Sequence, residues 1–113
     1  MKEVIPYLEH ILDAIRAIEA YTTDGRQAFL RDRKTQDAVI RNLEVIGEAT
    51  RNVPESFQAS YPDIPWQQAA ALRNVLIHKY FGVDLNIVWG VVEQELPPLK
   101  QRLQQLVETS QGS

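Results

Sequence analysis

The stretch VIPYLEHILDAIRAI, residues 4–18, decides the fold class of this chain. Its apolar residues recur every three or four positions, which is the spacing of one face of an α-helix. Charged residues interrupt this pattern throughout, so the stretch lacks the unbroken hydrophobic run of a signal peptide or a membrane span. We therefore expect a structural helix from about residue 3 to Tyr21, in a protein that does not enter a membrane.

The same period returns after a turn. Residues 22–25, with the sequence Thr-Thr-Asp-Gly, end the first helix, and residues 26–33 can form a short helix. Residues 35–52 then predict a second long helix that packs against the first. Gly47, next to Glu48 in this second helix, is a candidate for close helix packing.

Prolines divide the second half of the chain. The prolines in residues 52–65 predict a loop that can include one helical turn. Pro65 suits the first position of a third helix that runs from Trp66 to about Lys79, because its missing N–H costs nothing there. Asp84 is a candidate N-cap for a fourth helix.

Pro97 and Pro98 should kink this fourth helix, because each removes a backbone hydrogen bond and crowds the preceding turn. Residues 108–113 are expected to fray. The pattern as a whole predicts an all-α fold: an antiparallel up-and-down four-helix bundle with a short extra helix and a kinked C-terminal helix. We expect residues 1–113 to form a single domain.

Composition limits the classes of function. A chain of 113 residues that is 44% hydrophobic and 24% charged fits one hydrophobic core. Without cysteine it can form neither a disulfide nor a thiolate metal site, and a reducing cytoplasm is its natural compartment. The net charge of −3 argues against a sequence-independent nucleic-acid coat, although it permits a local basic cleft.

Residues 73–80, RNVLIHKY, concentrate reactive and phosphate-binding groups more than any other stretch. On an ideal helix Arg73 and His78 lie on opposite flanks of an apolar stripe, about 140 degrees apart. A joint site therefore needs either side-chain reach or a second chain. A two-fold dimer built on this helix could place each chain's His78 near the other chain's Arg73.

Such a pair is suited to RNA cleavage without a metal. Histidine titrates near neutral pH and can take the proton of a 2′-hydroxyl or supply one to the leaving oxygen. The planar fork of Arg73 suits phosphate oxygens. The structural alternative for each residue stays open, because an arginine on a helix is commonly a solvated charge and His78 could simply complement the helix dipole.

The order R-x4-H-x-Y in this stretch resembles the motif of the HEPN superfamily, and its tyrosine is typical of the HepT-like branch. The segments AVIRNLEVIGEA (38–49) and YFGVDLNIVW (80–89) are also similar to helices of that family, in the same order. The resemblance implies a metal-independent endoribonuclease toxin, active as a homodimer with Arg73 and His78 of both chains in one cleft. Asn74 matches the polar residue that commonly follows the arginine.

The resemblance also implies a partner. Such toxins are typically paired with a minimal nucleotidyltransferase antitoxin, which transfers AMP to the motif tyrosine, here Tyr80, and can form a larger hetero-oligomer with the toxin. The added phosphate and bulk next to a cleft for anionic RNA make physical sense of the inactivation. No cofactor is implied.

Two other functions stay open. The same bundle could be a non-catalytic module that binds a nucleotide or a nucleotidyltransferase, since a fold supports function only by analogy. A carboxylate-bridged metal enzyme could use Glu44 and Glu48, which lie one turn apart, but no Glu-x-x-His pair accompanies them. We therefore predict no metal site.

Overall fold

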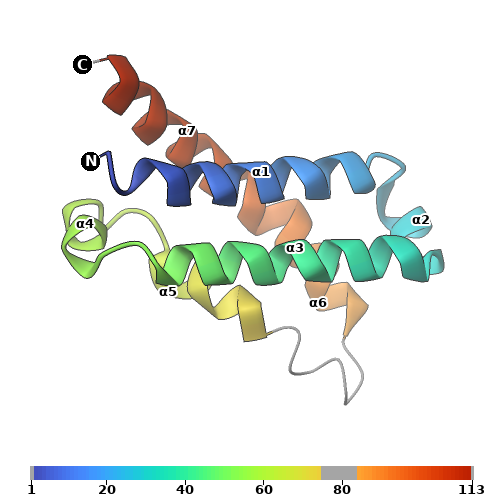
Figure 1. The fold of residues 1–113 in the computed structure, drawn as a ribbon. Coiled ribbons are helices and arrows are strands. Elements are labelled where there is room, and N and C mark those ends of the chain that lie inside the picture. The colour runs from blue at the N-terminus through green and yellow to red at the C-terminus, as the bar shows by residue number, and fades with distance from the viewer. Residues whose placement is uncertain (1, 75–83, 113) are drawn as a thin grey trace.

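The computed structural model describes residues 2–74 and 84–112, and these residues form helices and turns without a strand (Figure 1). The predicted all-α class is confirmed. None of the helices in the described ranges is long and apolar enough to cross a membrane.

Two long helices, α1 (Ile5–Tyr21) and α3 (Arg33–Arg51), run antiparallel side by side along the molecule (Figure 1). The short helix α2 (Gly25–Arg31) connects them. Gly25 has a φ of +88°, a left-handed conformation that glycine adopts without strain. This glycine therefore explains why the chain turns at residues 22–25, as predicted.

Asp32 separates α2 from α3 and caps the second of these helices. Its carboxylate accepts hydrogen bonds from the backbone N–H of Lys34 at 3.0 Å and from the hydroxyl of Thr35 at 2.8 Å. These bonds lower the pKa of Asp32 from its ordinary value, with the Thr35 hydroxyl as the largest cause. The cap satisfies a backbone donor that the first turn of a helix leaves without a partner.

The predicted third helix begins as an α-helix and changes to a 3₁₀ turn within the described residues. After α4 (Glu55–Ser60), α5 spans Trp66–Ala71, and residues 72–74 continue as a 3₁₀ turn. Pro65 is the N-cap of α5 and not its first helical residue. The predicted continuation to Lys79 lies outside the described residues.

The C-terminal segment is a continuous helix that changes from α to π and back to α along its length. It consists of α6 (Leu85–Gly90), a π-helical turn (Val91–Glu95) and α7 (Leu96–Gly112). The predicted cap is present, because the Asp84 carboxylate accepts from the backbone N–H groups of Asn86 and Ile87 at 2.9 and 3.4 Å.

The kink expected at Pro97 and Pro98 appears just before them. Leu96 donates its N–H to the carbonyl of Val91, which is the longer reach of a π-helix. The two proline rings would crowd the carbonyls one turn earlier, at residues 93 and 94, and the wider turn relieves that crowding. Helix α7 is described as far as Gly112, and the fraying expected of residues 108–113 stays a prediction.

The core lies where α1 packs against α3 and against α7, with α5 packed on α3. The predicted apolar stripes are the buried faces. The side chains with essentially no exposed surface include Leu8, Ile11, Ile15, Ile18, Val39, Leu43, Ile46, Val88 and Leu103. Trp66 is buried and donates its indole N–H to the carbonyl of Tyr61 at 3.0 Å.

Candidate active site

Arg73 lies on the 3₁₀ turn after α5, where this turn contacts α3. The contact depends on Gly47. A Cβ atom built on Gly47 would lie 2.5 Å from the backbone nitrogen of Arg73, 2.7 Å from its Cβ and 2.9 Å from the carbonyl oxygen of Ala70. Backbone atoms cannot move aside by changing a rotamer, so a larger residue here would push the two segments apart. The prediction that Gly47 permits close packing is confirmed.

The residue after Gly47 contacts the other end of the same arginine. Nη1 of Arg73 lies 3.2 Å from Oε1 of Glu48, with the two side chains 36% and 52% exposed. The ion pair therefore lies at the surface of the bundle and not inside it. The ion pair involves Nη1 of the guanidinium, which is a planar group with several N–H donors suited to phosphate oxygens.

The structure describes only part of the predicted motif. Asn74 is exposed and directly follows Arg73 on the 3₁₀ turn. His78 and Tyr80 lie outside the described residues. The structure thus places Arg73 beside Glu48 and next to Asn74, while the pairing of Arg73 with His78 stays a prediction.

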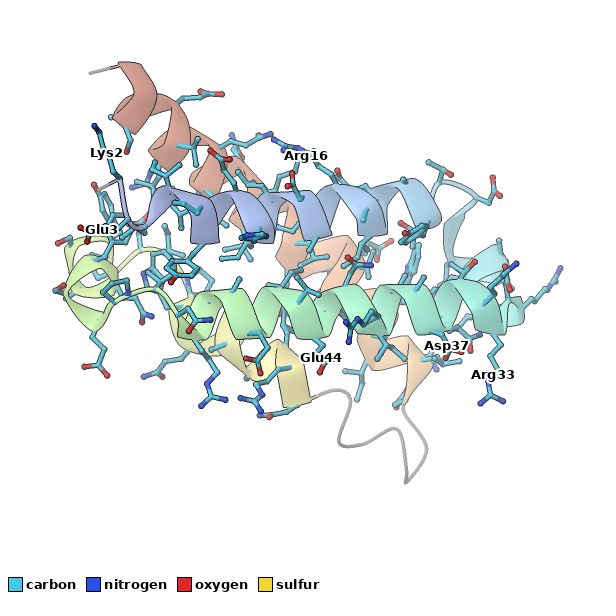
Figure 2. All side chains as sticks on the ribbon, in the orientation of Figure 1. Lys2, Glu3, Arg16, Arg33, Asp37 and Glu44 are labelled. Carbon is cyan, nitrogen blue, oxygen red and sulfur yellow. The ribbon has the colours of Figure 1, made fainter. Side chains whose placement is uncertain are left out.

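A groove of about 350 Å³ runs between α1 and α3 next to this ion pair, and Glu48 is part of its lining. Figure 2 shows the side chains on this face of the molecule, with Glu44 labelled on α3. The lining residues are Tyr7, His10, Arg41, Glu44, Val45, Glu48, Ala49 and Asn52. His10 of α1 thus lies at the surface near the candidate site.

Both acids considered for a metal site pair with arginines. Glu48 contacts Arg73, and Oε2 of Glu44 lies 3.3 Å from Nη1 of Arg41. Within residues 2–74 and 84–112 there is no group of three or more histidine or acidic side chains that could hold a metal ion. The described part of the chain therefore offers no donor set for the metal-enzyme alternative.

Comparison with known proteins adds the family. The model of the family described as "Ribonuclease HepT-like" matches residues 11–106, which covers most of the chain and includes Gly47, Glu48 and Arg73. This chain belongs to the HepT-like ribonuclease family, within the HEPN superfamily. The resemblance inferred from R-x4-H-x-Y and its flanking segments is confirmed.

Individual relatives agree with this membership. A protein of Thermococcus cleftensis named "Probable ribonuclease HepT" is 48% identical over 101 residues, which cover 88% of this chain and 92% of that protein. A Methanocaldococcus jannaschii protein named a "Putative RNase" is 42% identical over 112 residues, covering 98% and 93% of the two chains.

A second Methanocaldococcus jannaschii protein, named "Gamma-glutamylcyclotransferase and putative RNase", is 46% identical over 108 residues. The match covers 95% of this chain but only 49% of that protein, so the chain corresponds to about half of this relative. No solved structure matches the chain significantly.

Sequence reasoning missed the partner of Arg73. It considered Glu48 only as a possible metal ligand, because its spacing from Glu44 was the visible signal. The proximity of Glu48 to Arg73 depends on how α3 and α5 align, and Gly47 was the one indication in the sequence of where these segments meet.

Proposed function

We propose that this HepT-like chain is a metal-independent endoribonuclease toxin that cleaves RNA through Arg73 and His78. The observation that carries the proposal is the placement of Arg73, whose backbone packs on Gly47 and whose guanidinium contacts Glu48 at the surface of the bundle. Family membership supports the same activity. The names of the relatives, ribonuclease and RNase, agree with it.

The proposed chemistry needs only groups of the protein and the RNA. His78 takes the proton of the 2′-hydroxyl, whose oxygen attacks the adjacent phosphorus, and the bond from phosphorus to the 5′-oxygen breaks. A histidine in its protonated form supplies a proton to that leaving oxygen. Arg73 stabilises the charge that grows on the phosphate oxygens in between. DNA lacks the 2′-hydroxyl, so the mechanism selects RNA.

We further propose that the site is completed in a homodimer. Arg73 and His78 project about 140 degrees apart if the motif is helical throughout, so one chain alone does not place both on the same phosphate. A two-fold axis brings two copies of each residue into one cleft. Asn74, exposed beside Arg73, is a supporting residue that can donate a hydrogen bond to the bound RNA.

Inactivation is proposed to occur through Tyr80. A cognate minimal nucleotidyltransferase antitoxin transfers AMP to its hydroxyl, which places a negatively charged phosphate two residues from His78. Charge repulsion and bulk then exclude the RNA backbone.

The experiment that tests the activity incubates the purified, unmodified protein and its His78→Ala variant with total cellular RNA in EDTA, followed by gel analysis of the fragments. We expect the parent to cleave and the variant to be inactive. Circular dichroism of the variant should match the parent, because unfolding would instead support a structural histidine. Cleavage by neither protein would replace the proposal with the non-catalytic module that binds a nucleotide or a nucleotidyltransferase.

A further inference from the structure

We propose that Glu48 is a positioning residue for Arg73, which it orients for catalysis without contacting the RNA itself. This inference rests on the proposed function, since it takes Arg73 to be the phosphate-binding group. It assigns a role to an acid that the motif R-x4-H-x-Y does not contain.

The geometry is a two-point attachment. Gly47 and Glu48 are consecutive on α3, and each contacts a different end of Arg73. At Gly47 the backbone of the arginine lies too close for any side chain between the two segments. At Glu48 the carboxylate holds Nη1 of the guanidinium at 3.2 Å. An arginine side chain has many rotamers, and fixing both of its ends selects few of them.

The contact also leaves the group usable. The contact with Glu48 is made through Nη1, and the arginine side chain keeps about a third of its surface exposed. A planar guanidinium held at one nitrogen can still present its remaining edge to the non-bridging oxygens of a phosphate. The ion pair thus fixes the direction in which Arg73 meets the substrate.

Charge distinguishes positioning from binding. A carboxylate near a phosphate site repels the RNA backbone, so Glu48 weakens the affinity that Arg73 alone would provide. Its benefit must therefore come from orientation, which acts on the chemical step. Removal of the charge of Glu48 should therefore lower kcat without raising KM.

The matched control is on the same helix. Glu44 lies one turn before Glu48, lines the same groove and forms an ion pair with Arg41 at 3.3 Å. Replacing Glu44 with glutamine removes the same charge from the same face, yet leaves Arg73 and its two contacts unchanged.

The experiment measures kcat and KM on a single-stranded RNA for the parent, E48Q and E44Q. For E48Q we expect kcat to fall about tenfold or more while KM stays equal or falls. For E44Q kcat should stay at the parent value. E48D, which retains the charge on a shorter side chain, should recover part of the lost kcat.

The outcomes separate this inference from the proposed function. If the parent does not cleave RNA, the proposed function is wrong, and RNA is then not the substrate of this site. If the parent cleaves, Arg73→Ala is inactive and folded E48Q retains the parent kcat, only the role of Glu48 is wrong. An increase in KM with unchanged kcat would make Glu48 a binding residue, and an equal loss in E44Q would show a general charge effect. If E48Q does not fold, E48D tests the role of Glu48 instead. The inference then still requires that E48D have a reduced kcat and a KM close to that of the parent.

Discussion

The backbone nitrogen of Arg73 lies 2.5 Å from the position that a Cβ on Gly47 would occupy, so the absence of a side chain at residue 47 determines where the arginine stands. The carbonyl of Ala70 closes the same contact at 2.9 Å. Gly47, which is not part of the R-x4-H-x-Y motif, thus fixes the position of Arg73, the first residue of that motif, against α3.

Gly47→Ala should destabilise the protein and move Arg73. Overpacking costs about 1–3 kcal/mol, and the gain of about 0.5–1 kcal/mol from alanine in a helix offsets only part of it. Thermal unfolding measures the loss, and RNA cleavage by the folded fraction measures the displacement. Gly90→Ala is the control, because a Cβ there meets nothing within 4 Å and should leave the stability equal or higher. Equal stability of the two variants would contradict the contact.

Arg73→Lys retains the positive charge, yet it should reduce RNA cleavage by about a hundredfold. Lysine is a point charge and cannot hold Glu48 with one nitrogen while presenting a planar edge to phosphate. The folding free energy should change by less than about 1 kcal/mol, as expected for a partly exposed ion pair. Arg16→Lys, at an exposed pair on α1, is the control for a general change of basic side chain. Full activity of Arg73→Lys would remove the guanidinium from the mechanism.

Tyr80→Phe should leave RNA cleavage at the parent rate and abolish transfer of AMP by the cognate nucleotidyltransferase. The phenyl ring keeps the shape of the side chain but lacks the hydroxyl that accepts the nucleotidyl group. Intact-mass spectrometry after incubation with the transferase and ATP measures the modification. Mass addition to the variant would identify another residue as the acceptor.

The ion pair between Asp63 and Arg102 should contribute a pH-dependent part of the stability. Hydrogen bonding to Arg102 holds the pKa of Asp63 below its ordinary value of 3.8, and the pKa of Arg102 is raised by the same bond. A lowered carboxyl pKa stabilises the folded state above the unfolded pKa, and this stabilisation is lost as the pH falls through the folded pKa. The raised pKa of Arg102 adds stability that is lost only in strong alkali.

Asp63→Asn should therefore lower the melting temperature at neutral pH, and its difference from the parent should shrink as the pH falls below 3.8. Thermal melts followed by circular dichroism across that range measure it. Because both side chains are partly exposed, the effect should be small. Asp13→Asn removes the more exposed pair with Arg16 and should have less effect at any pH. A constant difference for Asp63→Asn down to strong acid would assign its effect to packing instead.

The sequence by itself determined the elements whose causes are local. Apolar spacing predicted the long helices, Gly25 marked the turn after the first of them, and the side chain of Asp84 marked the start of α6. The motif and its flanking segments indicated the family. Each of these signals depends on residues within a few positions of one another, so it can be read without knowing the fold.

Only the tertiary structure decided which distant residues meet. The pairing of Arg73 with Glu48 and that of Asp63 with Arg102 each join separate segments, whose alignment is set by packing across the bundle. The π-helical turn before Pro97 also differs from a simple kink, because the chain relieves proline crowding while α7 stays packed on α1. Helix periodicity predicts which face is buried, but the register of one buried face on another depends on the shapes of both, as at Gly47.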